Sequence, residues 1–276
     1  IGVFEMEFNI VRELNGKFDP IVLIKTDEKP DEEVISPKPG MNGCIMPFVA
    51  QTIAKRKISL FERDNITCGG VATGLGWGNG FKTPQDMEFQ ATFLSLGQDS
   101  AKNKEEFLSR LEYIPKNTAE MFKYGERIYC DFDTALEHIK KRPIYDEKQY
   151  VVFKGIENLK EGEIPDSVIF TLNPIELSAV LQINYSFRRD TAHIMTPQAA
   201  SCQAIGSFTF QQGDSDDPVP VLSPLDFAAR GHMKHFIPDE YMNLSMPWNL
   251  FLKLEELSKN SVFQTNLWKD WKTRID

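Results

Sequence analysis

The stretch SVIFTLNPIELSAVLQI, residues 167–183, places a predicted strand directly before a predicted helix. Its first six residues are rich in β-branched and aromatic side chains, which favour a strand. Asn173-Pro174 follows as an N-cap and a first-turn proline, so a helix is expected over 175–183. The apolar stretches PIVLIK (20–25) and YVVFKG (150–155) predict two more strands.

Hydrophobic periodicity and turn signals predict further elements at irregular intervals. We expect helices at 5–14, 45–54, 83–96, 104–113, 117–124, 134–141, 198–205, 248–257 and 266–275, and short strands at 207–211, 218–222 and 243–246. Because no regular βαβ repeat is present, we expect an α+β fold, with a mixed sheet and packed helices. A single unit of 1–276 is expected, with two subdomains (about 1–145 and 146–276) as the alternative.

Length, composition and charge exclude several classes of protein. The chain has 276 residues, of which 41% are hydrophobic and 26% charged, so it can bury a substantial core. Its net charge of −9 argues against general nucleic-acid binding, which needs a basic surface. No run of 18 apolar residues is present, so we expect no membrane-spanning helix and no membrane partner.

Cysteine usage bears on the compartment. Four cysteines without close paired spacing are too few for a disulfide scaffold. Reduced thiols of this kind are typical of the cytoplasm, which is therefore the expected location. The chain begins at Ile1 rather than Met, so a removed signal peptide is left open.

The positions of the cysteines suggest a site. Three fall in the longest charge-free stretches: Cys44 in 39–54, Cys68 in 65–81 and Cys202 in 191–213. Charge-free segments with Gly and Ala are typical of buried, closely packed backbone. We therefore expect three thiols inside the protein, each near a helix start or a tight turn, where the pKa of a thiol is lowered.

Two interpretations of these thiols compete. Cysteine is a small and often buried hydrophobe, so each of the three could be purely structural. Alternatively, the three converge and hold a metal or an iron–sulfur cluster as thiolates, with one coordination position open. No Cys-x-x-Cys pair is present, and the long separations along the chain neither support nor forbid convergence.

Landmarks of one family run along most of the chain. They are Gly43-Cys44, Cys68-Gly69-Gly70, Gly74-Leu75-Gly76, Asn173-Pro174, Ala200-Ser201-Cys202, Asp226 with Arg230, IPDEYMNLSMP (237–247) and Ser261-Val262-Phe263. With these landmarks the chain resembles the DUF169 family of uncharacterised archaeal and bacterial proteins. The resemblance implies a single α+β unit in which Cys44, Cys68 and Cys202 are family positions, and it implies no established activity.

Other motifs carry weaker signals. The segment CGGVATGLGWGNG (68–80) departs from the phosphate-loop and dinucleotide templates, so we expect a turn where backbone approaches backbone or a ligand. Trp77 could stack on a planar ligand or plug the core. Arg230 could grip an anion, although helical spacing favours its pairing with Asp226. The pair His232 and His235 is expected at the solvated surface, and no serine-hydrolase elbow or His-Glu-x-x-His motif is present.

Two functions remain. The first is a buried site for a metal, an iron–sulfur cluster or a small ligand, formed by Cys44, Cys68 and Cys202, with Gly69, Gly70, Trp77 and Arg230 as further ligand-binding residues. The second is a small-molecule binding or sensor module with structural cysteines and no catalysis. A thiol-dependent enzyme is a third possibility, and no catalytic residue is assigned. An iron–sulfur cluster would colour anaerobic protein brown, whereas the binding module would be colourless.

Overall fold

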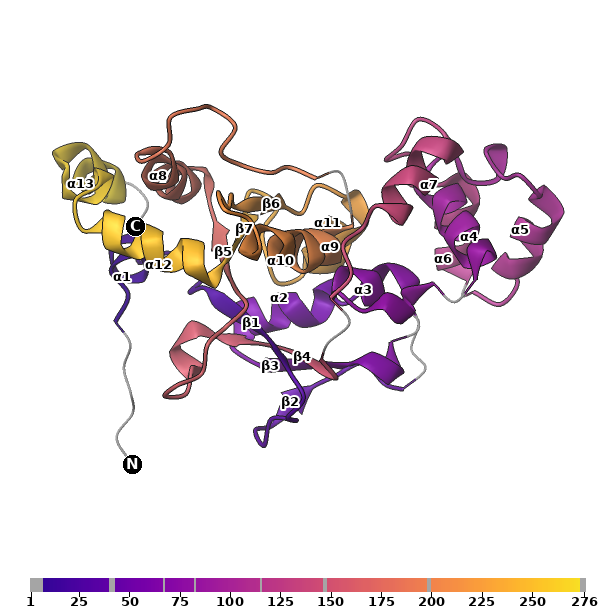
Figure 1. The fold of residues 1–276 in the computed structure, drawn as a ribbon, viewed down its shortest axis with the longest axis horizontal. Coiled ribbons are helices and arrows are strands. Elements are labelled where there is room, and N and C mark those ends of the chain that lie inside the picture. The colour runs from indigo at the N-terminus through magenta and orange to yellow at the C-terminus, as the bar shows by residue number, and fades with distance from the viewer. Residues whose placement is uncertain are drawn as a thin grey trace.

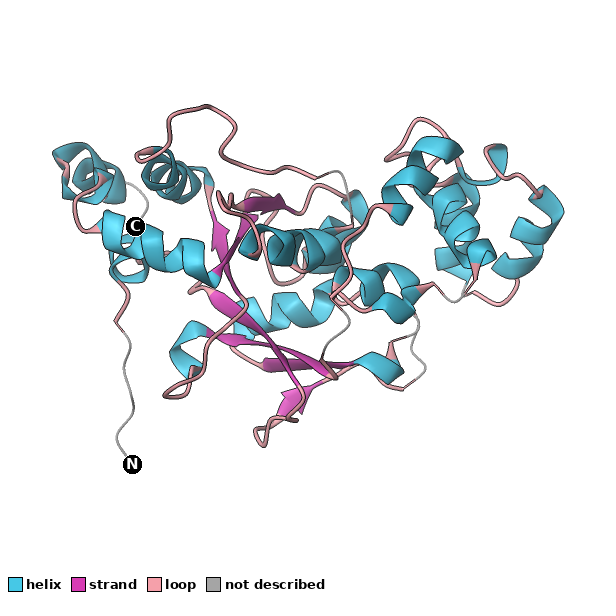
Figure 2. Ribbon diagram, viewed as in Figure 1, coloured by secondary structure: helices cyan, strands magenta, loops and turns pink. Residues whose placement is uncertain are grey.

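In the computed structural model, the described residues are 7–39, 43–66, 68–81, 83–114, 116–145, 148–197 and 200–273. One seven-stranded sheet runs through them (Figures 1 and 2). From edge to edge its strands are β2 (Val34–Ile35), β3 (Ile58–Glu62), β4 (Tyr150–Gly155), β1 (Ile21–Thr26), β5 (Ser167–Leu172), β7 (Met242–Pro247) and β6 (Val221–Ser223).

The sheet is mixed. The pair β2–β3 is parallel, whereas β1 is antiparallel to both of its neighbours, β4 and β5. Strands from before and after residue 145 are interleaved, because β1 lies between β4 and β5. The α+β fold class with a mixed sheet is confirmed, and the predicted strands at 20–25, 150–155, 167–172 and 243–246 all belong to this sheet.

Helices cover both faces of the sheet. One face packs against α2 (Met46–Lys55), α3 (Gly69–Gly74), α9 (Ser201–Ile205), α10 (Ser207–Gly213) and α11 (Phe227–Met233). The other packs against α1 (Asn9–Leu14), α8 (Pro174–Tyr185), α12 (Trp248–Ser258) and α13 (Asn266–Lys272). Because side chains alternate along a strand, Ile169 joins the first core while Val168 and Phe170 join the second.

A helical lobe projects from the sheet, on the right of Figure 1. It contains α4 (Pro84–Leu94), α5 (Lys104–Leu111), α6 (Lys116–Tyr124) and α7 (Phe132–Lys140). Its core is separate and is built on residues such as Phe93, Leu94 and Ile139. A capping box starts α4, because Thr83 and Asp86 each bond the other's backbone N–H.

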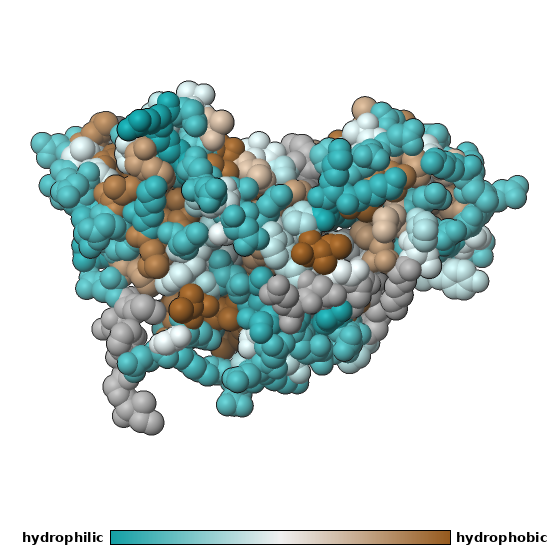
Figure 3. Space-filling model, in the orientation of Figure 1, coloured by the Kyte–Doolittle hydropathy of each residue, from teal (hydrophilic) through white to brown (hydrophobic). Residues whose placement is uncertain are grey.

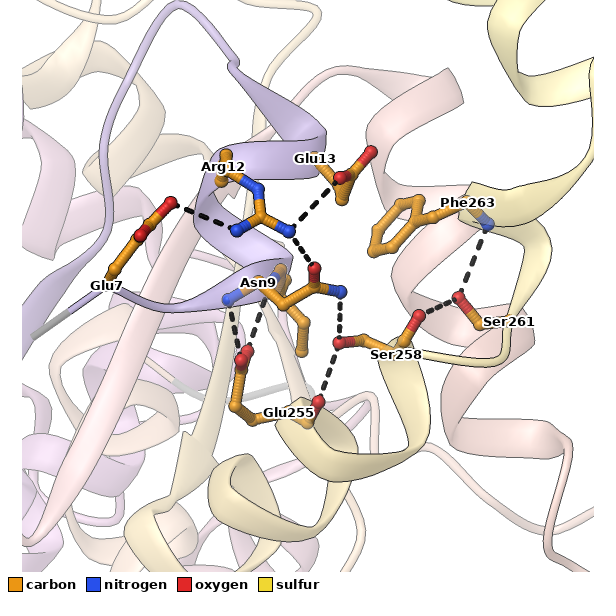
Figure 4. A network of polar contacts seen from close by, with 9 residues as sticks. Glu7, Asn9, Arg12, Glu13, Glu255, Ser258, Ser261 and Phe263 are labelled. Atoms are coloured by element: carbon orange, nitrogen blue, oxygen red, sulfur yellow. Dashed lines mark hydrogen bonds and ion pairs between the residues drawn. The ribbon is translucent and has the colours of Figure 1, made fainter.

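The first helix is capped from a distant part of the chain (Figure 4). The N-cap residue Phe8 provides no side-chain hydrogen bond to α1. Instead, the Glu255 carboxylate on α12 accepts the backbone N–H groups of Asn9 at 2.6 Å and Ile10 at 3.0 Å. The Asn9 amide donates to Ser258 Oγ at 2.8 Å. These bonds satisfy the first turn of α1 and tie it to α12.

Two local expectations are wrong. The predicted strand at 207–211 is part of helix α10, because the buried Phe210 packs against the core that α9 also covers. Within the glycine-rich segment, residues 69–74 form helix α3 rather than a turn. Backbone does approach backbone at two of the three glycines of α3, as expected: a Cβ on Gly69 would lie 2.3 Å from the Gly80 carbonyl oxygen, and one on Gly74 would lie 3.0 Å from the Cys202 carbonyl carbon. Residues 198 and 199 of the predicted helix at 198–205 lie outside the described part of the chain, as do residues 5–6 and 274–275 of the first and last predicted helices.

The described helices agree with the expectation of no membrane-spanning helix. Within the described residues, no helix has the length and apolar character needed to cross a bilayer. On the face drawn in Figure 3, hydrophilic residues predominate and hydrophobic residues form small separate patches.

Candidate functional site

A cavity of about 300 Å³ lies between the helical lobe and the helices on the first face of the sheet. The lobe contributes side chains of α4 and α6, including Gln90, Phe93 and Phe122. The sheet side contributes residues at the starts of α2, α3, α9 and α11. All three cysteines singled out from the sequence, Cys44, Cys68 and Cys202, line this cavity, which we call the thiol cavity.

Each thiol stands at the start of a helix, as expected. Cys44 lies just before α2, and its sulfur accepts the backbone N–H of Met46 at 3.4 Å. Cys68 is the N-cap residue of α3. Cys202 is the second residue of α9, and its thiol donates to the Gly70 carbonyl at 3.6 Å. The sulfurs of Cys44 and Cys68 therefore accept N–H groups that helix starts leave without intrahelical partners, whereas the Cys202 thiol acts as a donor.

The expected lowering of thiol pKa is wrong. Burial raises the pKa of Cys44 to about 12, and it also raises the pKa of Cys68 and, still more, that of Cys202. The N–H groups of Val71 and Gly70 act in the opposite direction on Cys68, but desolvation of the thiolate outweighs them. The cavity thiols are therefore protonated at neutral pH.

The thiols share a cavity, but the described residues show no metal-binding cluster. Among the described residues, no group of three or more His, Cys, Asp or Glu side chains is arranged to hold a metal ion. All four cysteines are free, and Cys130 is exposed, outside the cavity, with its thiol donating to Asp131 at 3.1 Å.

Asp226 joins two helices at the cavity wall. Its carboxylate accepts the backbone N–H of Ser201 at 2.8 Å and that of Ala229 at 2.6 Å, together with the Ser201 hydroxyl. It thereby caps α11 and holds the start of α9. The expected pairing of Asp226 with Arg230 is wrong, because the Arg230 guanidinium donates to the Asp239 carbonyl at 2.8 Å instead.

Glu126 is the second carboxyl group of the cavity wall. It follows α6, and its backbone N–H donates to the Phe93 carbonyl at 2.8 Å. Within the described part of the chain, its carboxyl group has no hydrogen bond or ion pair. Burial, and next the charge of Asp226, raise the pKa of Glu126 to about 7.

This raised pKa makes stability depend on pH. Between about pH 4.5 and 7 the folded protein binds more protons at Glu126 than the unfolded chain does, so stability falls as the pH rises. Replacing Glu126 by Gln should leave stability near pH 4.5 little changed and raise it near pH 8 by roughly 2 kcal/mol. Urea unfolding at both pH values measures this, with the exposed Glu120→Gln on α6 as control. Equal effects of Glu126→Gln at both pH values would contradict the assignment.

The other ligand-binding predictions have different positions. Gly70 lines the cavity, whereas Gly69 lies against Gly80, whose carbonyl oxygen a Cβ on Gly69 would approach to 2.3 Å. Trp77 is 1% exposed in the core, and its indole donates to the Lys148 carbonyl at 2.8 Å. Neither Trp77 nor Arg230 is among the described residues of the cavity wall. Ligand binding by these residues stays a prediction.

Sequence reasoning missed most of the lobe side of the cavity. Glu126 stands in an ordinary charged stretch, KYGERIY (123–129), with no motif around it. Phe93 and Phe122 are ordinary apolar residues within the predicted helices at 83–96 and 117–124. His232 and His235 are both exposed, as expected, although His232 also lines the cavity. Only the meeting of α4 and α6 with the sheet-side helices brings these groups together.

Fold and site define a single-sheet α+β protein with a ligand-sized cavity between its core and a helical lobe. The chain belongs to the DUF169 family, described as uncharacterised ArCR, which it matches over residues 9–257. The match includes all three cavity cysteines and confirms the family resemblance. A search of curated proteins and a search of solved structures found no match.

Proposed function

We propose that the protein binds a small, largely apolar molecule in the thiol cavity. The observation that carries this proposal is the cavity itself, which at about 300 Å³ falls in the range of small-molecule sites. Its wall is mainly hydrophobic, with Val71, Phe93, Leu94 and Phe122 among its members, and it holds a few polar groups. Such a wall favours an apolar ligand body with one or two polar contacts.

Two other hollows in the described structure are less suitable as the site for such a ligand. One, of about 430 Å³, is lined by charged side chains that pair with one another, such as Lys154 with Glu163 and Lys160 with Glu32. The other, of about 440 Å³, lies beside α1 and is lined by Phe8, Val11 and charged side chains. Neither gathers groups from as many distant segments as the thiol cavity does.

Filling the cavity tests the proposal. Gly70 has space at its Cβ position, with Gln90 Nε2 at 3.7 Å and Cys68 Sγ at 3.8 Å, so Gly70→Leu should project into the cavity. We expect this variant to fold and to lose binding of octan-1-ol by about tenfold or more, measured by calorimetry. The matched control is Gly231→Leu on α11, where a Cβ meets nothing within 4 Å. Unchanged binding by Gly70→Leu would place the ligand elsewhere.

A thiolate-bound metal or iron–sulfur cluster is the second candidate. It is favoured by one observation, the presence of three cysteines from distant segments in one cavity wall. Against it, no group of three or more His, Cys, Asp or Glu side chains among the described residues is placed to hold a metal ion. We expect no stoichiometric iron or zinc in anaerobically purified protein. A full equivalent that disappears in Cys202→Ser would reverse the order of the two candidates.

Alkylation distinguishes both candidates from a thiol-dependent enzyme. Since the thiolate is the reactive form, we expect iodoacetamide at pH 7.5 to modify the exposed Cys130 at least about tenfold faster than Cys44 or Cys202. Peptide mass spectrometry over time gives the four rates separately. A cavity cysteine that reacts faster than Cys130 would indicate thiol catalysis.

A further inference from the structure

The thiol cavity has an acidic wall. Among the described residues that line it are two carboxyl groups, Glu126 and Asp226, and no Lys or Arg. The one basic side chain among them, His232, stands on α11. A cavity of this composition disfavours an anionic ligand and favours a cationic one.

The two carboxyl groups differ in what they have left to bind. Asp226 already accepts three hydrogen bonds, from the backbone and hydroxyl of Ser201 and the backbone of Ala229, and these bonds hold α9 and α11. Glu126 is partly buried, and no described side chain or backbone group bonds its carboxyl oxygens. A carboxylate at this depth gains most from a charged partner that enters the cavity.

Aromatic rings stand in the same wall. Phe93 of α4 and Phe122 of α6 are stacked, with ring centroids 3.9 Å apart and an interplanar angle of 11°. Both line the cavity, and Glu126 bonds through its backbone to Phe93. Because the two rings cover each other's facing surfaces, they offer the cavity apolar surface for the hydrocarbon body of a ligand rather than an open face for its charge.

We propose that the thiol cavity selects apolar organic cations, with the protonated amine of the ligand bound at Glu126 and its hydrocarbon body against Phe93 and Phe122. This inference rests on the proposed small-molecule function and names the class of ligand. The ligand's charge would be the partner that the described residues do not supply to the Glu126 carboxylate.

The charged surroundings of Glu126 agree with this placement. Asp226 and the thiols of Cys44 and Cys68 interact electrostatically with it, and His232 stands on the neighbouring helix. The buried Arg142 acts electrostatically on the thiols of Cys68 and Cys202, and it is not among the described residues that line the cavity. The charged groups that line the cavity beside Glu126 are therefore Asp226 and His232.

Three probes of equal chain length test the proposal on the unmodified protein: octylamine, octan-1-ol and octanoate. By calorimetry at pH 8, we expect octylamine to bind at least about tenfold more tightly than either of the others. Glu126→Gln should remove this advantage and leave octan-1-ol affinity within about twofold. Glu120→Gln, also on the lobe but exposed, should change neither.

The outcomes separate the two proposals. Equal binding of octylamine and octan-1-ol, or an octylamine preference that survives Glu126→Gln, would overturn the cation selectivity and keep the small-molecule site. Binding of none of the three probes would overturn both. For a ligand held by the carboxylate, octylamine affinity should also weaken as the pH falls from 8 to 6, whereas octan-1-ol affinity should not.

Discussion

Replacing Asp226 by Ala is expected to destabilise the protein by about 4 kcal/mol, because buried hydrogen bonds to a charged acceptor contribute roughly 1.5–3 kcal/mol each. Asp226 is 8% exposed and accepts three such bonds. Its removal leaves the N–H groups of Ser201 and Ala229 without partners inside the protein. Guanidinium chloride unfolding followed by circular dichroism measures the loss.

The control for this variant is Asp131→Ala. Asp131 also caps a helix, because its carboxylate accepts the Thr134 N–H at 2.8 Å at the start of α7, but it is exposed. An exposed N-cap contributes about 1 kcal/mol. If Asp226→Ala costs no more than Asp131→Ala, Asp226 is an ordinary cap and not a joint between α9 and α11.

The second large effect is expected for Gly125→Ala, which should cost more than about 3 kcal/mol. Gly125 has a φ of +72°, and a Cβ there would lie 2.4 Å from the Gly97 nitrogen and 2.5 Å from the Ser95 carbonyl oxygen. This close backbone crossing ends α6 and sets the position of the next residue, Glu126. Urea unfolding measures the change in stability.

Gly162→Ala separates backbone strain from steric clash. Gly162 has a similar φ of +80°, but a Cβ there meets nothing within 4 Å. Its replacement should cost only the left-handed conformational penalty of about 1–2 kcal/mol. Equal losses of stability in Gly125→Ala and Gly162→Ala would show that the backbone at Gly97 can shift to accommodate a Cβ on residue 125 with no further loss of stability.

The sequence predicted much of the fold because its strongest signals are local. Apolar strands such as 150–155 and 167–172, and the cap-plus-proline starts at Thr83 and Asn173, act over a few residues and need no tertiary context. The prediction of a strand at 207–211 was wrong because it was based on the local alternation of apolar and polar residues. In the structure these residues form α10, which packs against the same core as α9. The glycines at 69–74 were expected to form a turn, because glycine has a low intrinsic helix propensity. In the structure they form α3, where Gly74 allows close packing against Cys202 of α9.

The candidate site could be predicted only from one side. Charge-free stretches marked Cys44, Cys68 and Cys202 as interior residues near helix starts, and the structure brings all three to one cavity. The lowered thiol pKa was wrong because a helix start was considered without the desolvation that burial adds. Glu126 carried no local signal, since its importance arises from the docking of the lobe.

Methionine methyl groups offer the most direct test that the thiol cavity is the ligand site. Met46 and Met121 line it from opposite sides, one on α2 and one on α6. With methyl-¹³C-methionine, assigned by Met46→Leu and Met121→Leu, titration with octylamine should shift both resonances along one saturating curve. Methionines away from the cavity, such as Met242, should not move. Saturable shifts confined to other methionines, or none at all, would contradict a ligand site in this cavity.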